Sequence, residues 1–302
     1  MPQENPIVSN ITPSIIKVPN LTNKAIIISV STGAFGTQKK DQKASNQIAI
    51  DNNNNAKVAR VTKTLMSGRE FKDITNQRQK ITQIYHKATS EWKKGERILR
   101  IRDYIKTKQD LEDAVREFYK LVDVAVDNLD MIINEDQRQL GNLFNPSDYP
   151  DKSRFRSYFY AKISVGEVEK NDFRSSILSD EENEEINNQI AERIDEAIKN
   201  SKRDIFNRVF EKASKLIERL DATEGKFHAS AVSNVIEAIA EARKLNIDED
   251  KTVEDILDQV ENSISNIDAE SVRGSEVVRA SALASSKEAV NKIVDSMEGL
   301  GL

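Results

Sequence analysis

The chain of 302 residues contains no cysteine, only two histidines and one tryptophan. Without cysteine it forms no disulfide and no thiolate metal site, and two histidines are too few for most zinc sites. No apolar run approaches the roughly 18 residues that a membrane-spanning helix needs. The opening residues, MPQENPIVSN, lack the basic and apolar regions of a signal peptide. We therefore expect a soluble, cytoplasmic protein without a metal or other cofactor.

Glycine and proline are also scarce, with 10 and 6 residues. The composition, 38% hydrophobic and 31% charged with only 6% aromatic residues, is typical of long solvated helices rather than of a thick globular core. We expect an elongated, mainly helical molecule.

One apolar pattern runs from Ile101 to about Ile133 with the seven-residue spacing of a coiled coil, interrupted only by Lys108. Its two seam positions are occupied by Ile101, Val115, Val122 and Leu129, and by Tyr104, Leu111, Phe118, Ala125 and Ile132. Because no glycine or proline lies between Gly95 and Gly141, the pattern predicts one helix of roughly 35 residues. A second long helix, with an eleven-residue apolar period, is predicted from about Asp180 to Leu220 as its antiparallel partner.

Short strands are predicted on both sides of the first long helix. Lys24 to Val30 (KAIIISV) is rich in β-branched residues, and Arg154 to Val165 (RFRSYFYAKISV) alternates apolar and polar side chains. Asp172 to Ile177 is a third candidate. Together they predict a small sheet at one end of the helix pair.

The predicted fold is therefore mainly α (α+β): two long antiparallel helices in a coiled-coil-like pair, a small antiparallel sheet at one end, and short C-terminal helices. Four regions are expected: a flexible N-terminal arm (1–22); a strand, a basic loop and short helices at about 56–66 and 70–91 (23–95); a long helical hairpin with the inserted strand 154–165 (96–225); and C-terminal helices with a tail (226–302). The tail helix, about 273–297, has a weak apolar face, so we expect it to be detachable or to form an oligomer contact.

Charge is unevenly distributed along the chain. Residues 1–125 carry 22 Lys and Arg against 13 Asp and Glu, whereas residues 126–302 carry 23 against 37. This asymmetry favours a basic end that meets phosphate, or equally two ends that attract one another between subunits.

A basic segment follows the first predicted strand. Gly33 to Ser45 (GAFGTQKKDQKAS) combines two glycines with Lys39, Lys40 and Lys43, so it is predicted to be a mobile loop able to bind phosphate. It lacks the Gly-Lys-Ser/Thr ending of a P-loop, which argues against ATP hydrolysis. The alternative is an ordinary solvated loop, the more usual role of a charge run.

The polar face of the second strand combines aromatic rings and cations, as a single-stranded nucleic-acid platform does. The residues on this face are Arg154, Arg156, Tyr158, Tyr160 and Lys162. Aromatic residues stack on bases while cations hold the backbone. Tyrosines also pair across the strands of ordinary sheets, and that alternative stays open.

A third basic cluster precedes the first long helix. Lys94 and Arg97 share one side through their three-residue spacing, beside Lys93, Arg100 and Arg102. The cluster can contact a ligand, or it can pair with the acidic run 180–185 at the start of the second long helix.

Four segments, in this order, resemble those of a known family. They are GTQKKDQKAS after a strand, YHKATSEWKKGERILR before the long helix, LFNPSDYP after it, and NDFR after the aromatic strand. They resemble a phage- and prophage-encoded family of unknown function (DUF3150-like) over about Ala25 to Ile247. The resemblance implies a phage DNA-metabolism context in the cytoplasm of a bacterial host, near genes for a MoxR-type AAA ATPase or recombination proteins. It supplies no catalytic residues, and the chain departs from the family at Ser90–Lys94, where relatives are more acidic.

Two functions follow from these observations. The first is a non-enzymatic phage protein that binds or anneals single-stranded DNA and assembles into homo-oligomers. The second is a self-associating coiled-coil adaptor or structural phage protein that binds a protein partner such as an AAA ATPase. No nucleophile motif favours an enzyme.

Overall fold

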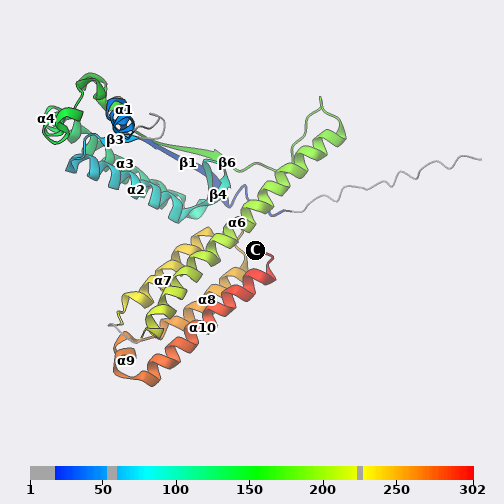
Figure 1. Cartoon of the computed structure of the whole chain (residues 1–302). Helices are drawn as coiled ribbons and strands as arrows, with labels where there is room; N and C mark the ends of the chain where they lie inside the picture. Colours follow the sequence, from blue (N-terminus) through cyan, green and yellow to red (C-terminus); the bar gives the residue numbers. More distant parts are fainter. Residues whose placement is uncertain (1–17, 53–59, 223–226) are drawn as a thin grey trace, which may run out of the picture. The chain divides into compact units, whose positions relative to one another are not determined.

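The computed structural model describes residues 18–52, 60–222 and 227–302, and is mostly helical with a small antiparallel sheet (Figure 1). Most of the predicted arm, residues 1–17, lies outside the described residues. The hydrogen-bonded order in the four-stranded sheet is β4-β5-β1-β6. These strands are β1 (Ala25–Gly33), β4 (Ser90–Lys93), β5 (Glu96–Arg100) and β6 (Tyr160–Glu167). The predicted class, mainly α with a small sheet, is confirmed.

The chain divides into two compact units, described separately here. Unit 2 comprises residues 28–89 and 93–166, and unit 1 comprises the remainder. The charge asymmetry follows this division. The sequence of unit 2 carries 25 Lys and Arg against 17 Asp and Glu, a net charge of +8, whereas that of unit 1 carries 20 against 33, a net charge of −13.

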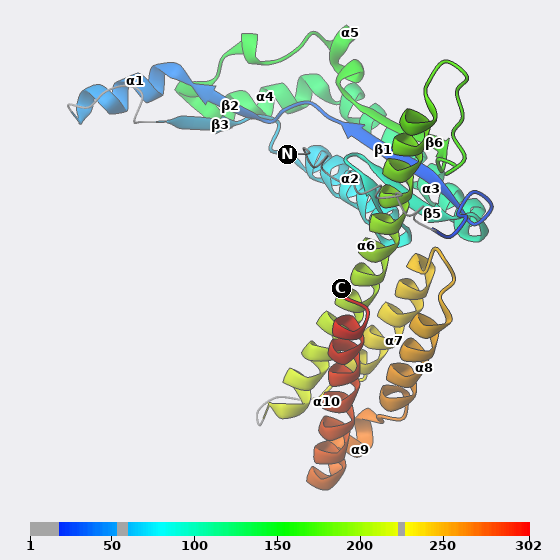
Figure 2. The same cartoon turned by 90° about the vertical axis from the view of Figure 1, so that its right-hand side faces the viewer.

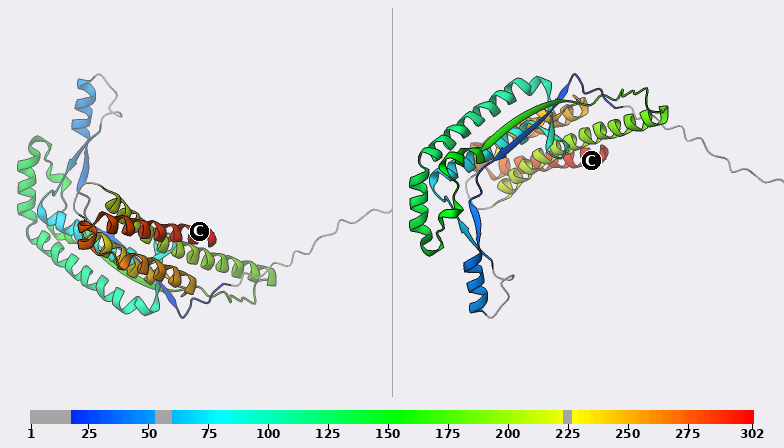
Figure 3. Two further views of the ribbon diagram at one scale, coloured as in Figure 1. Left: turned by 90° about the horizontal axis from the view of Figure 1, so that it is seen from below. Right: turned by 90° about the horizontal axis from the view of Figure 1, so that it is seen from above.

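Four helices of unit 1 form a bundle. The long helix α6 (Asp180–Asp221) packs against α7 (Ser230–Ala242) and α10 (Glu276–Gly299), and α8 (Lys251–Ser265) packs against α7 and α10. Figures 2 and 3 show α7, α8 and α10 alongside the C-terminal half of α6. Short connections, including η4 (Arg243–Leu245) and α9 (Ala269–Gly274), make neighbouring helices antiparallel.

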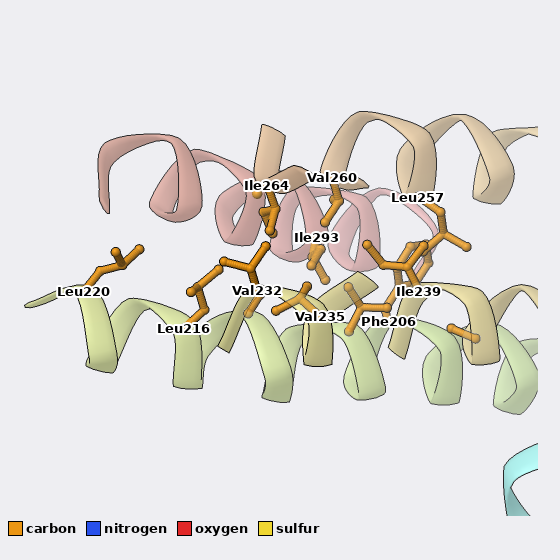
Figure 4. Close-up of a cluster of buried hydrophobic side chains, with 14 of the residues drawn as sticks. Phe206, Leu216, Leu220, Val232, Val235, Ile239, Leu257, Val260, Ile264 and Ile293 are labelled. Atoms are coloured by element: carbon orange, nitrogen blue, oxygen red, sulfur yellow. The ribbon is translucent and has the colours of Figure 1, made fainter. Parts of the chain in front are cut away.

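The bundle closes around an apolar core (Figure 4). Phe206 and Leu216 of α6 meet Ile239 of α7, Leu257 of α8 and Ile293 of α10, all at most 1% exposed. Burying each such side chain contributes roughly 1.5–3 kcal/mol. The eleven-residue period of α6 is confirmed except at Lys212, which is only partly buried. The buried members of the period are Ile194, Ile198, Ser201, Ile205, Val209, Leu216 and Leu220.

The tail helix is an integral part of this bundle, which corrects its prediction as detachable. In α10, Ala282, Ser286, Ala289 and Ile293 are buried. Because Ala282, Ser286 and Ala289 are small, the buried face of α10 is hard to recognise in the sequence. The same small side chains allow α10 to pack closely against α6 and α8. Leu283, Val290 and Met297 of α10 also pack against the core of the bundle.

In unit 2, α2 (Arg69–Ala88) pairs with α3 (Ile101–Asp127). The prediction of a helix near 70–91 is thus confirmed. Apolar residues recur along α2 as Phe71, Ile74, Ile81 and Tyr85, and all are buried. The turn between β4 and β5 depends on Gly95, whose φ of 83° suits a residue without Cβ.

The predicted pairing of the two long helices is wrong. The partner of α3 is α2, and the partners of α6 are α7 and α10. In addition, α3 ends at Asp127, and α4 (Leu129–Leu140) starts after Asn128, whose ψ of 4° departs from the helix. A heptad stripe shows that a face is buried, but not which helix covers it.

The lysine-bearing part of the predicted mobile basic loop is regular structure, whereas residues 34–37 form neither helix nor strand. Gln38–Asp41 forms β2, which pairs antiparallel with β3 (Val61–Thr64), and Gln42–Asp51 forms α1 with Asp41 as its N-cap. Figures 2 and 3 show α1 extending outward from the end of this strand pair. The helix predicted at 56–66 is therefore wrong over β3, and residues 56–59 lie outside the described residues.

The strand predicted from Arg154 begins only at Tyr160. Residues before it form α5 (Lys152–Phe155) and η3 (Arg156–Tyr158), preceded by η1 (Gly141–Leu143) and η2 (Pro146–Asp148). Phe155 and Phe159 are both buried. Their four-residue spacing fits a helical turn as well as an alternating strand, so periodicity alone could not separate the two.

The third candidate strand, 172–177, is not part of the sheet. Asn187 of α6 exchanges two hydrogen bonds with the backbone of Phe173, at 2.8 and 2.9 Å. Asn183 does the same with the backbone of Ser175, at 2.8 and 3.0 Å. The asparagine side chains therefore replace a neighbouring strand as hydrogen-bonding partners of this segment.

Candidate nucleic-acid interface

The predicted contact residues lie at several places on unit 2. Lys39 and Lys40 are on β2, and Lys43 is in the first turn of α1. Lys94 is in the β4–β5 turn, and Arg97 is on β5. The remaining residues lie in the segment 152–162: Arg154, Arg156, Tyr158, Tyr160 and Lys162.

Lys39 takes part in a buried ion-pair network. Its ammonium lies 2.8 Å from Asp148 Oδ1, whose other oxygen lies 2.6 Å from Lys63 Nζ. Lys63 also pairs with Asp41 at 3.2 Å and donates to the carbonyl of Leu143 at 2.7 Å. The Lys63 side chain is only 5% exposed. This network fastens the β2–β3 pair to the turn η2, so Lys39 has a structural partner.

Lys63, Asp148 and Asp41 of this network have shifted pKa values. Burial alone would lower the pKa of Lys63, but hydrogen bonds and charges from Asp148 and Asp41 outweigh burial and raise it. Burial alone would raise the pKa of Asp148, but Lys39 and Lys63 outweigh it and lower the pKa. The pKa of Asp41 is lowered by the N–H of Ala44 and by Lys63. All three groups are therefore ionised at neutral pH.

A second buried carboxylate supports the same region. Asp136 Oδ2 accepts hydrogen bonds from the N–H of Met66, at 2.5 Å, and from the hydroxyl of Tyr149, at 2.7 Å. Met66 has a φ of 51°, rare for a residue with a side chain. Burial and the carboxylate raise the pKa of Tyr149. Asp136 thus fixes the chain before α2.

Arg97 is held by structural contacts. Its guanidinium donates to Thr89 Oγ1 at 2.7 Å and to the Thr89 carbonyl at 2.6 Å, and it lies 5.8 Å from the centre of the Tyr85 ring. Lys94 is exposed. The structure therefore separates these two predicted residues: Arg97 connects β5 to the end of α2, and Lys94 is at the surface.

A groove opens where residues 152–160, here called the aromatic turn, meet α3. It has a volume of about 540 Å³ and is lined by Tyr119, Ser153, Arg156, Ser157 and Phe159. The guanidinium of Arg156 lies 5.3 Å from the centre of the Tyr119 ring and 2.7 Å from Asp123 Oδ1. The bond to Asp123 raises the pKa of Arg156. Because Asp123 pairs with Arg156, the groove offers a planar base mainly ring surface and two serine hydroxyls.

Two further tyrosines of this segment are half-exposed. Tyr158 is 45% and Tyr160 50% exposed, whereas Phe155 and Phe159 are buried. Tyr158 packs edge-on against Phe35, with ring centres 5.5 Å apart. Each tyrosine is therefore anchored on one side and open to solvent on the other.

Tyr160 covers the backbone of Gly33, where an added Cβ would collide with its ring. We expect Gly33→Ala to destabilise unit 2 by about 1–3 kcal/mol, the usual effect of overpacking. Urea denaturation followed by circular dichroism measures this change. In the Tyr160→Ala background the same substitution should cost much less, and an equal cost in both backgrounds would contradict the close contact.

Sequence patterns missed Tyr119, Ser153 and Ser157. Tyr119 lies in the middle of α3, 37 residues before Arg156. Its phenol oxygen accepts the N–H of Ala161 at 3.2 Å, which joins α3 to the start of β6. No local spacing indicates this contact, because it forms between distant segments. The two serines carry an i, i+4 spacing, visible only once this segment is known to be helical.

Within residues 18–52, 60–222 and 227–302, no group of three His, Cys, Asp or Glu side chains is placed to hold a metal ion. None of the helices in these ranges is both long and apolar enough to cross a bilayer. Comparison with protein-family models, curated proteins and solved structures identified no match for this chain.

Proposed function

We propose that this chain is a non-enzymatic phage DNA-metabolism protein that binds or anneals single-stranded DNA, with the aromatic turn of unit 2 as its contact surface. The observation that carries the proposal is the groove at Tyr119 and Arg156, flanked by the half-exposed Tyr158. Aromatic rings accept any base on their faces, so such a surface binds a strand without reading its sequence.

Charge supports the same assignment. Unit 2 carries a net charge of +8 in a chain of net charge −5, and a positive unit attracts a polyanion by long-range steering. Exposed cations near or within the aromatic turn include Arg154 and Lys162. Lys39 contributes less than its sequence position suggests, because Asp148 neutralises it.

The test is the double variant Tyr158→Ala/Arg154→Ala, which removes one exposed ring and one exposed cation. We expect a roughly 5- to 150-fold weaker affinity for a labelled oligo(dT), since each stacked base contributes about 1–3 kcal/mol. The slope of log affinity against log salt should fall by about 0.7 for the lost cation. Fluorescence anisotropy at several salt concentrations measures both quantities.

A matched control is Tyr104→Ala/Arg138→Ala, which removes a tyrosine and an arginine of unit 2 outside the aromatic turn. Affinity should stay within about twofold of the unmodified protein. Equal weakening by both double variants would remove the aromatic turn from the proposal. Absence of any binding by the unmodified protein at about 50 mM salt would end it.

The second candidate is an adaptor that self-associates or binds a protein such as an AAA ATPase. One observation favours it: the N-terminal part of α6 continues beyond the other helices of the bundle (Figures 1 and 2). The segment hydrogen-bonded to that part exposes Phe173 by 39% and Ile177 by 92%. The resemblance to DUF3150-like proteins and the phage context that it implies are part of both proposed functions.

A further inference from the structure

A second open cavity lies in unit 1, between the C-terminal half of α6 and the start of α7. Its volume is about 720 Å³. The lining residues come from these two helices and the ends of their connection: Lys212, Lys215, Leu216, Glu218, Arg219, Ala222, His228, Ser230, Ala231 and Asn234. A cavity of this size accommodates a nucleotide-sized molecule.

Cations dominate the wall of this cavity. Lys212, Lys215 and Arg219 follow one another at three- and four-residue spacings, so they share one face of α6. His228, from the segment before α7, also lines the cavity, and Glu218 is the single carboxylate among its described lining residues. The wall therefore presents several positive donors to one volume.

Two of these cations have no counter-ion within the part of the chain that the structure describes. Lys215 binds Glu211 at 2.6 Å, but neither Lys212 nor Arg219 forms an ion pair with a described residue. By contrast, Arg243 of the same unit contacts three carboxylates at 2.6–2.8 Å. Lys212 and Arg219 therefore place positive charge at this cavity in a unit of net charge −13.

The floor of the cavity is apolar while its rim is polar. Leu216 is 1% exposed and belongs to the bundle core. Ser230 and Asn234 of α7 add a hydroxyl and an amide. A low-dielectric floor strengthens the attraction between the cations and an anion above it.

We propose that this cavity binds the phosphate group of a nucleotide-sized ligand through Lys212 and Arg219, with Lys215 and His228 beside them. Arginine supplies the planar fork that phosphate oxygens accept, and lysine supplies a point charge. The phosphate belongs either to a free nucleotide or to a residue of a bound strand, and the two sources share this chemistry. The site is separate from the aromatic turn, so it goes beyond the function proposed above.

The test uses the full chain and isothermal titration calorimetry at about 50 mM salt. The probes are inorganic pyrophosphate, thymidine monophosphate and oligo(dT). We expect Lys212→Gln and Arg219→Gln each to weaken binding about tenfold. Lys287→Gln, which removes an exposed lysine of α10, should leave it unchanged, and circular dichroism should show that all three variants remain folded.

The three probes distinguish a phosphate of a free nucleotide from a phosphate of a bound strand. Weaker binding of pyrophosphate and the mononucleotide assigns the cavity to a free ligand, whereas weaker binding of oligo(dT) alone assigns it to a strand. The proposal is overturned if none of the probes binds, or if Lys287→Gln weakens binding as much as Lys212→Gln. It is also overturned if the two cavity variants only lower the unfolding temperature, because the cations then serve the C-terminal end of α6.

Discussion

Replacing Lys63 by methionine is expected to lower the free energy of unfolding of unit 2 by about 3–5 kcal/mol, as removal of one partner from a buried ion pair does. The substitution keeps an unbranched apolar side chain, one atom shorter than that of lysine, and removes the charge. Asp148, whose side chain is 7% exposed, then loses its 2.6 Å contact with Lys63. Asp41 and the carbonyl of Leu143 lose their partner as well.

Urea denaturation followed by circular dichroism measures the overall loss. Hydrogen exchange of β2 and β3 shows whether it arises at the predicted place. The control is Lys40→Met on the same strand, where the side chain is exposed and the change should stay within about 0.5 kcal/mol. Similar losses in the two variants would show that the buried network adds little stability.

The same network predicts a pH dependence. Because the folded pKa of Asp148 lies below its ordinary value of 3.8, its stabilisation is present above that value and is lost as the pH falls through the folded pKa. The raised pKa of Lys63 acts in the opposite direction: its stabilisation is present below 10.5 and is lost as the pH rises through the folded pKa. Lys63→Met should therefore flatten the stability profile at both ends.

Phe206→Ala is expected to destabilise the four-helix bundle by about 3–5 kcal/mol, the usual cost of removing a buried phenylalanine. Phe206 is fully buried in the core that joins α6 to α7, α8 and α10. Its removal takes away apolar contacts and leaves a cavity that the surrounding helices fill only in part.

Phe210, one turn further along α6, supplies a matched control because it is 37% exposed. Phe210→Ala should cost about 1 kcal/mol or less. Hydrogen exchange should report the loss in α7 and α8, while β2 and β3 keep the exchange rates of the unmodified protein. Equal effects at the two positions, or equally fast exchange throughout both units, would contradict the division of the chain into two compact units.

Several features of the fold follow from local patterns. The apolar periods of α2 and α6 predict both helices, and KAIIISV predicts β1, because helix and strand periodicity depend on residues near in sequence. The scarcity of glycine, proline and aromatics predicts a mostly helical molecule. The charge count along the chain predicts a basic and an acidic part. The unit boundaries do not follow one point in the sequence, because residues 90–92 belong to unit 1 although the segments on both sides of them belong to unit 2.

Local patterns failed where distant residues decide the structure. Lys39 and Lys40 have the composition of a loop, but β3 pairs with both, and Lys39 and Lys63 share Asp148 in an ion-pair network. Arg154 to Tyr158 alternates like a strand, but Phe155 packs against Phe35 and Phe71 in a helical turn. In both cases long-range packing outweighs the preference of the segment.

The sequence by itself determined the helical class, the extent of α2 and α6, and the separation of charge, since each depends on composition or on neighbours a few residues apart. Only the tertiary structure decided that α3 pairs with α2, that α10 completes a bundle, and that Tyr119 meets Arg156. Each of these contacts joins segments far apart in the chain, and apolar or aromatic surfaces gain similar free energy from many partners. The partner is therefore set by how all the elements pack together.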